Sequence, residues 1–170
     1  MPVSSTAIKA ALCGALLALP AAAQDVRKIT FQDFERPEFV RVADLLPERA
    51  DNMLVLSFWD RDCAPCLVEL AHLPSLADRN TDMRFAAVAT GDVRRSRQWL
   101  TRRPMAKSQR GVDLLRVAND PAGIMREMGN ARGAYPFNVA VNHKGEVCAY
   151  GARMLDQAGI GVMRKACKGK

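Results

Sequence analysis

The most informative stretch of the chain runs from Leu54 to Cys66 and reads LVLSFWDRDCAPC. It belongs to a continuous apolar run, Met53 to Trp59, which is interrupted only by Ser57 and is typical of a β-strand buried on both faces. Beyond this run the apolar residues recur with helical spacing, at Cys66, Leu70, Leu73 and Ala77. The sequence therefore predicts that a C-x-x-C pair lies where a central strand ends and a helix begins.

Cys63 and Cys66 suit redox chemistry at such a junction. Unpaired backbone N–H groups and the macrodipole at a helix N-terminus stabilise a thiolate, so Cys63 is expected to attack disulfides. Cys66, one turn further, is expected to resolve the mixed disulfide that results. Pro65 has the fixed φ that suits a first helical turn. The cysteine pair would itself be the redox group, with no other cofactor.

Two other interpretations of the pair stay open: a zinc site and an inert structural disulfide. Zinc usually takes four ligands, whereas the sequence has only two histidines, His72 and His143, and no second C-x-x-C. A structural disulfide would not require a position between a strand and a helix. Redox chemistry is therefore favoured, no metal site is expected, and both histidines are expected to be surface or packing residues.

Apolar runs and turn signals predict the remaining elements. Strands are expected at residues 83–90, 112–117, 137–142 and 146–151, and helices at residues 93–103, 121–128 and 155–167. Residues 24–40 are polar and are expected to have little regular structure. The order β-α-β-α-β-α-β-β-α indicates an α/β domain in which a central mixed β-sheet carries helices on both faces.

The first 23 residues are arranged as a secretory signal peptide. Lys9 precedes the apolar residues 10–20, and three alanines end at Ala23, before Gln24. The apolar stretch is about half of the ~20 residues needed to cross a bilayer, so an uncleaved anchor is the weaker alternative. We expect residues 1–23 to be removed and residues 24–170 to form one periplasmic domain.

The chain is basic, with a formal net charge of +7. Many of the positive residues cluster in one segment, at Arg94, Arg95, Arg97, Arg102, Arg103, Lys107, Arg110 and Arg116. No aromatic or helix-turn-helix pattern accompanies them, and export argues against nucleic acid as a partner, so a solvated face is favoured. Docking to an acidic partner, or a transient contact with an anionic membrane surface, is the alternative.

Cys148 and Cys167 are candidates for a structural disulfide. Alternation along the strand at 146–150 directs Cys148 to the face opposite Val147 and Ala149. On the last helix, Cys167 shares one apolar stripe with Ile160 and Met163 and so points toward the sheet. The two sulfurs meet if that stripe packs on the Cys148 face. The alternative is two separate buried thiols.

Two ordered motifs resemble the thioredoxin superfamily and, within it, the periplasmic TlpA-like branch. The first is F-W-x-x-x-C-x-P-C-x-x-E, matched by Phe58, Trp59, Cys63, Pro65, Cys66 and Glu69. The second begins at Tyr135-Pro136-Phe137 and continues through residues 139–147, VAVNHKGEV, like the family's X-Pro, strand and glycine-containing hairpin. The resemblance implies a thioredoxin-like fold and a thiol-disulfide oxidoreductase activity.

The resemblance also implies roles for residues around the pair. Pro136 matches the family's cis-proline, whose loop lies beside the disulfide and pairs with the substrate backbone. Tyr135 would flank the sulfurs and restrict which substrates fit, and Trp59 and Pro65 would join the substrate-binding surface. Glu69 would supply any proton relay; its alternative role is a charge on the helix surface.

Some positions depart from the family pattern. Asp62 stands where the family usually has tryptophan, and a carboxylate beside the nucleophile opposes thiolate formation. Arg61 acts in the opposite direction. Ser57 occupies the position of the buried acid of thioredoxins. The proline usual soon after the motif is absent at Ala71, with Pro74 three residues later.

The favoured function is a reductase of exported proteins with disulfides, supplied with electrons by a membrane donor of the DsbD or CcdA type. A disulfide oxidase is the first alternative. A copper chaperone with a thioredoxin fold is a weaker one, because such proteins typically pair a C-x-x-x-C with a distant histidine. A non-catalytic interaction module is weaker still, since both cysteines are present.

Overall fold

The computed structural model describes residues 24–102 and 111–168. The predicted signal peptide, and Arg103, Lys107 and Arg110 of the basic segment, lie outside these ranges. The elements are β1 (Thr30–Asp33), β2 (Phe39–Arg41), α1 (Val42–Leu45), β3 (Met53–Trp59), α2 (Ala64–Arg79), β4 (Arg84–Ala89), α3 (Val93–Thr101), β5 (Val112–Arg116), α4 (Pro121–Glu127), β6 (Phe137–Asn142), β7 (Val147–Gly151) and α5 (Gln157–Cys167).

The strands form one mixed sheet in the order β2-β1-β5-β4-β3-β6-β7. Strands β3, β4 and β5 are parallel, whereas β6 pairs antiparallel with β3, and β7 with β6. Strand β3 lies near the middle of the sheet and all of its residues are buried, as its continuous apolar run predicts. The carboxyl ends of β3 and β4 therefore meet the start of β6 at one edge of the sheet.

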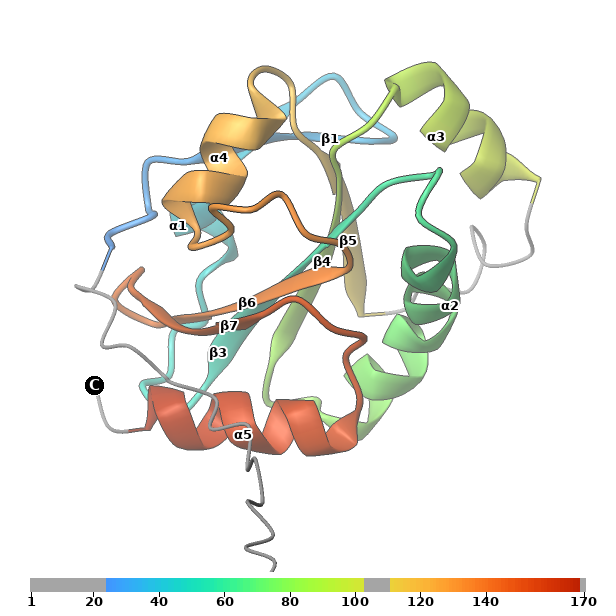
Figure 1. Ribbon diagram of the computed structural model, residues 1–170. Coiled ribbons are helices and arrows are strands. Elements are labelled where there is room, and N and C mark those ends of the chain that lie inside the picture. Colours follow the sequence, from blue (N-terminus) through green and yellow to red (C-terminus); the bar gives the residue numbers. More distant parts are fainter. Residues whose placement is uncertain (1–23, 103–110, 169–170) are drawn as a thin grey trace, which may run out of the picture.

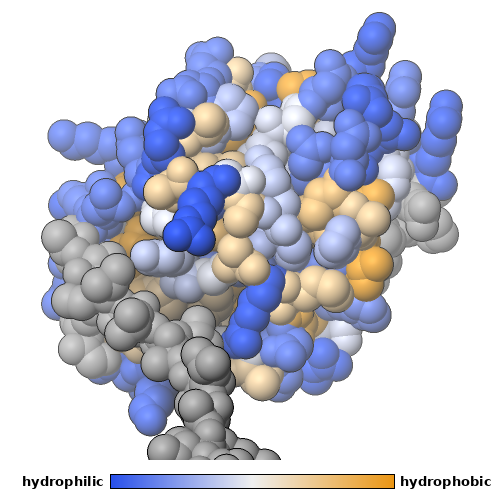
Figure 2. All heavy atoms as spheres, viewed as in Figure 1, coloured by the Kyte–Doolittle hydropathy of each residue, from blue (hydrophilic) through white to orange (hydrophobic). Residues whose placement is uncertain are grey.

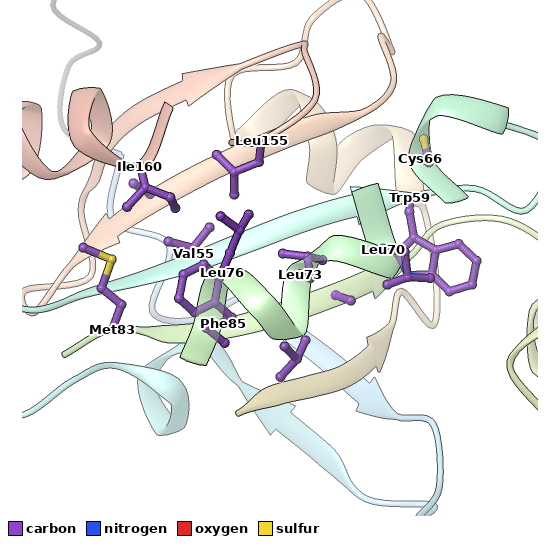
Figure 3. Close-up of a cluster of buried hydrophobic side chains, with 14 of the residues drawn as sticks. Val55, Trp59, Cys66, Leu70, Leu73, Leu76, Met83, Phe85, Leu155 and Ile160 are labelled. Carbon is purple, nitrogen blue, oxygen red and sulfur yellow. The ribbon is translucent and has the colours of Figure 1, made fainter. Parts of the chain in front are cut away.

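Helices cover both faces of the sheet (Figure 1). One core joins the sheet to α2, α3 and α5 through residues such as Leu73, Leu100 and Ile160. The other core joins it to α1 and α4 through Leu45 and Met125. Figure 3 shows the first core, in which leucines of α2 lie near Val55 and Phe85 of the sheet, with Leu155 and Ile160 beside them. The predicted α/β class, with a mixed sheet and helices on both faces, is confirmed.

The predicted order of elements is confirmed from β3 to α5. Residues 24–40 are a correction, because they are not irregular: β1 and β2 pair in this segment, with Phe31 opposite Val40. Phe31 is fully buried and β1 also pairs with β5. Strands of three and four residues are too short for alternation to stand out in a polar segment.

Helix α5 begins two residues later than predicted. The carboxylate of Asp156 accepts a hydrogen bond from the backbone N–H of Gly159 at 2.7 Å and so caps the helix. Leu155 consequently lies in the segment before the helix, where it is buried against α2. Among residues 24–102 and 111–168, no helix has both the length and the apolar character needed to cross a membrane.

Candidate active site

A tight turn carries the chain from β3 to α2. The backbone N–H of Cys63 donates to the carbonyl of Asp60 at 3.1 Å, and the N–H of Asp62 donates to the Asp60 carboxylate at 2.8 Å. Gly91, after the end of β4, lies against this carboxylate so closely that a Cβ there would collide with it. The turn is therefore fixed both by its own hydrogen bonds and by the neighbouring loop.

Cys63 and Cys66 are joined by a disulfide at the start of α2, with Cα atoms 5.3 Å apart. Cys63 is the N-cap residue, and its sulfur accepts a hydrogen bond from the backbone N–H of Cys66 at 3.2 Å. Cys63 is partly exposed, whereas Cys66 is 1% exposed. The first sulfur is thus accessible and lies in the field of the helix N-terminus, which favours negative charge.

The surface on the α2 side of the disulfide is apolar. Ala64 and Pro65 are exposed in the first turn of α2, and Val68 in the next turn is 48% exposed. Figure 2 shows apolar side chains gathered over the region where Figure 1 places α2, with charged side chains around them. Pro65 therefore lies on the surface where the resemblance places a substrate contact.

Glu69 lies inside the protein and not on the helix surface, so the alternative role of a surface charge is wrong. Its side chain is 1% exposed. The carboxylate accepts hydrogen bonds from the Ser57 hydroxyl at 2.5 Å, from the Asn138 amide at 3.1 Å and from the backbone N–H of Leu155. These donors come from β3, β6 and the segment before α5, so one carboxylate, a turn below Cys66, connects three parts of the fold.

Trp59 is a correction to the predicted substrate-binding set. Its side chain is 1% exposed, in the same buried cluster as Cys66 and Leu70. Figure 3 shows the ring close to the helical turn that carries Cys66. The ring also packs against Trp99 of α3, with centroids 5.9 Å apart. A buried indole supports the site from within the core and does not contact a substrate.

The loop of Tyr135 and Pro136 lies beside the end of β3. Phe58 pairs with Phe137, so the antiparallel register places Pro136 next to Trp59. The Tyr135–Pro136 peptide bond is cis. Pro136 is buried, which leaves its backbone and the half-buried Tyr135 as the groups that this loop offers at the edge of the site.

The phenol of Tyr135 is anchored at the edge of the sheet. It donates to the Thr90 hydroxyl at 2.7 Å, and that hydroxyl donates to the carbonyl of Trp59 at 3.1 Å. Burial raises the pKa of Tyr135 above its usual 10.0; the hydrogen bond to Thr90 lowers it, and the charge of Asp60 raises it further. Tyr135 is therefore a neutral hydrogen-bond donor at physiological pH.

A groove of about 400 Å³ lies between Tyr135 and α4. Apolar atoms dominate its walls, which come from α4 and the segment that leads to Tyr135: Pro121, Ala122, Met125, Arg126, Asn130, Ala131, Gly133 and Tyr135. Since Tyr135 belongs both to this groove and to the loop beside Trp59, the groove borders the site. It offers room for an apolar side chain near a cation, Arg126.

Asp62, directly before Cys63, is held by two arginines. The two terminal guanidinium nitrogens of Arg95 each donate to one carboxylate oxygen of Asp62 at 2.9 Å, and a guanidinium nitrogen of Arg61 lies 3.3 Å from one of these oxygens. Arg95 belongs to α3, so the contact joins the active-site turn to a distant part of the sequence. Sequence reasoning noted Arg61 and Asp62 but missed Arg95.

Within the described part of the chain, no three His, Cys, Asp or Glu side chains are arranged to hold a metal ion. His72 is exposed on α2 and His143 lies in the turn between β6 and β7. Neither histidine lies within the turn that carries Cys63 and Cys66.

Cys148 and Cys167 form a second disulfide, with Cα atoms 5.0 Å apart. It joins β7 to the last residue of α5. Both cysteines pack against the core between the sheet and α2, and Cys148 also contacts the carbonyl of Ala140 through its sulfur. This disulfide is remote from the turn that carries Cys63, which fits a structural role.

Asn138 is a further polar residue that sequence reasoning missed. It donates from one amide nitrogen to Glu69 and to the carbonyl of Arg153. A signal was present, because Ser57 and Asn138 each interrupt an apolar strand and the two residues pair in the register of β3 and β6. Polar residues inside buried strands require partners, and Glu69 is the partner they share.

Comparison with family models and with characterised proteins finds no match to the sequence. The fold, in contrast, matches many solved structures. One is a secreted disulfide oxidoreductase of Mycobacterium tuberculosis, described as homologous to E. coli DsbE, with a TM-score of 0.60 and 17% identity over 85% of this chain and 99% of that one.

Two further solved structures with a similar fold are named as thioredoxins. A putative thioredoxin from Neisseria meningitidis has a TM-score of 0.63 and 17% identity over 85% of this chain and 90% of that one. An exposed lipoprotein thioredoxin from Streptococcus pneumoniae has a TM-score of 0.62 and 14% identity over 81% of this chain and 97% of that one. At these identities the likeness shows the fold alone.

Proposed function

The chain has the thioredoxin fold, and we propose that it is an exported thiol-disulfide oxidoreductase that reduces disulfides of specific periplasmic proteins through Cys63 and Cys66. The observation that carries the proposal is the position of the cysteines. Cys63 caps α2 with a partly exposed sulfur, while Cys66 lies buried behind it within disulfide distance. An attacking thiol and a resolving thiol need this arrangement.

The reaction transfers two electrons from the cysteine pair to the substrate. The Cys63 thiolate attacks one sulfur of the substrate disulfide, forming a mixed disulfide and releasing the first substrate thiolate. The Cys66 thiolate then attacks the Cys63 sulfur, which forms the Cys63–Cys66 disulfide and releases the second substrate thiolate. The two protons lost by the cysteines balance those taken up by the substrate thiolates.

Glu69 is the proposed acceptor of the Cys66 proton. Cys66 must lose its proton in a buried place, where a thiolate is costly without help. Glu69 lies one helical turn further along α2 and is buried in the same core. Its hydrogen bonds to Ser57 and Asn138 hold the carboxylate in place, so the proton has a fixed acceptor one helical turn from the resolving cysteine.

Substrate recognition is assigned to the apolar surface around the disulfide and to the loop of Tyr135 and Pro136. An extended substrate segment would pair with the backbone of this loop, as the resemblance implies. Pro65 and Val68 would contact the segment on the α2 side. Tyr135 would restrict which side chain lies next to the substrate cysteine, because hydrogen bonding to Thr90 fixes its ring.

The partners we propose are exported proteins with disulfides and a membrane electron donor of the DsbD or CcdA type. Export is supported by the signal-peptide pattern of residues 1–23 and by the likeness to a secreted disulfide oxidoreductase. A reductase in an oxidising compartment must be reduced again after each cycle, and a membrane protein that carries electrons across the bilayer fills that need.

A trapping experiment tests the proposal. A Cys66→Ser variant lacks the resolving thiol and should accumulate mixed disulfides with periplasmic proteins, visible as bands that a reductant removes. A Cys63→Ser variant serves as the matched control and should trap nothing. Trapping by Cys63→Ser alone would reverse the assignment, and trapping by neither variant would contradict disulfide exchange.

A further inference from the structure

Asp62 and Arg95 form an ion pair immediately beside Cys63. Two N–O distances of 2.9 Å, one to each carboxylate oxygen, make the contact bidentate, which is the strongest geometry available to an arginine and a carboxylate. Their side chains are 60% and 49% exposed, respectively. Exposed pairs contribute little to stability, so the fold alone gives no strong reason for this one.

The position of the Asp62 carboxylate, directly before Cys63, gives the ion pair an influence on the reactivity of this cysteine. A free carboxylate next to Cys63 would repel the thiolate and suppress its attack. The positive charge of the Arg95 guanidinium, which is bound to Asp62, offsets the negative charge of this carboxylate. Other charged or titratable groups around the cysteine are Asp60 and Arg61 in the turn, Glu69 in α2, Asp92 at the start of α3, and Tyr135. Of the described arginines, Arg61 and Arg95 are the two that contact Asp62.

Arg95 is held on a fixed element. Asp92 caps α3 by accepting the backbone N–H of Arg95 at 2.8 Å. Further along the helix, Arg97 donates to the carbonyl of Phe34 at 3.1 Å, and Trp99 packs on Trp59. The helix cannot move away without breaking these contacts, so the guanidinium is already in position before any substrate arrives.

We propose that Arg95 is a positioning residue for Cys63: by holding and neutralising Asp62, it keeps the carboxylate from suppressing the nucleophile. The inference rests on the proposed role of Cys63 as the attacking thiol. It explains how the chain tolerates an acid where the resembling family has a tryptophan. It also assigns a function to one member of the basic segment.

The test measures alkylation of Cys63 by iodoacetamide against pH in the fully reduced protein, with tandem mass spectrometry separating Cys63 from Cys66. Arg95→Gln should raise the midpoint for Cys63 by roughly half to one pH unit. Arg94→Gln is the matched control, because it removes the same charge from the neighbouring position of α3, where the side chain is exposed and makes no ion pair with a described residue. It should move the midpoint by less than a third of that shift.

An Asp62→Asn variant, alone and combined with Arg95→Gln, completes a double-mutant cycle. In that background Arg95→Gln should lose more than half of its effect, because the charge that Arg95 neutralises is gone. Equal shifts from Arg95→Gln and Arg94→Gln, or a full effect of Arg95→Gln in the Asp62→Asn background, would overturn the proposal.

Alkylation needs no substrate, so the test separates this inference from the proposed function. If wild-type Cys63 reacts as an ordinary thiol, with a midpoint near about 8.5, the proposed function fails. If wild-type Cys63 has a lowered midpoint that does not respond to Arg95, this inference fails and the proposed function stands.

Discussion

The hydroxyl of Ser57 donates to the carboxylate of Glu69 at 2.5 Å inside the protein, between the central strand and the helix that carries the cysteines. The relationship matters because the resemblance to thioredoxins places Ser57 where that family carries a buried acid. A buried acid is present in this chain, but it projects from α2 instead of β3. A serine on the strand provides the donor that holds it.

Glu69→Gln should slow the step in which Cys66 displaces the substrate. Glutamine has the same shape but cannot accept the thiol proton, and loss of a general base typically costs on the order of a hundredfold. We expect mixed disulfides of the variant to persist in a stopped-flow assay, with alkylation of Cys63 unchanged. Glu127→Gln, on the exposed end of α4, is the control. Resolution at the wild-type rate would remove Glu69 from the mechanism.

The phenol of Tyr135 should titrate above pH 10. Burial disfavours the phenolate and raises the pKa of Tyr135 from its usual 10.0. The chain has two tyrosines, so the difference in absorbance at alkaline pH between wild type and Tyr135→Phe isolates this group. Because the folded pKa is raised, its contribution to stability is full below pH 10 and is lost as the pH rises further. A midpoint at or below 10 would contradict the burial of the ring.

Removal of the Cys148–Cys167 disulfide should reduce stability without affecting electron transfer. The bridge spans 19 residues of sequence. For such a loop the chain-entropy model gives a stabilisation on the order of 3 kcal/mol. In denaturant unfolding, a Cys148→Ala, Cys167→Ala double variant should show a free energy of unfolding lower by this amount. Non-reducing peptide mass spectrometry of periplasmic material should find the bridge. Free thiols at both positions, or loss of disulfide exchange in the double variant, would argue against a structural role.

The ion pair of Asp82 and Arg164 should make the domain sensitive to acid. The hydrogen bond from Arg164 lowers the pKa of Asp82 below its usual 3.8, and burial opposes this effect. Stability from the pair is therefore present above pH 3.8 and is lost as the pH falls through the lowered pKa. Asp82→Asn should cost about 0.5–1 kcal/mol at pH 7, as for a screened pair, and progressively less as the pH falls below 3.8. A cost that stays constant as the pH falls would contradict a charge effect.

The sequence predicts the fold well from β3 onward because patterns of apolar residues are long there. The run at Met53–Trp59 and the helical spacing that follows it locate the cysteine pair correctly. Strands β1 and β2 could not be predicted, because β1 pairs with β5, which is distant in the sequence, and β2 joins the sheet through β1. A strand of three or four residues carries too little periodicity to compete with a polar composition.

The residues of the site likewise divide into those that local motifs predict and those that depend on contacts distant in the sequence. Cys63, Cys66 and the Tyr135–Pro136 loop follow from local motifs. The partner of Asp62 does not, because Arg95 lies 33 residues away on another helix and is one arginine among many in its segment. The buried run Met53–Trp59 indicates a core position for Trp59, so the resemblance that placed this residue among the substrate contacts was misleading at this position.

The equilibrium redox potential of the Cys63–Cys66 couple, measured against glutathione, tests the proposed reductase most directly. We predict a value more negative than about −200 mV, on the side of thioredoxin at about −270 mV. The Cys148→Ala, Cys167→Ala variant should give the same value, which assigns the potential to the active-site pair. A value near about −120 mV, typical of a strong oxidant, would contradict the reductase and favour a disulfide oxidase.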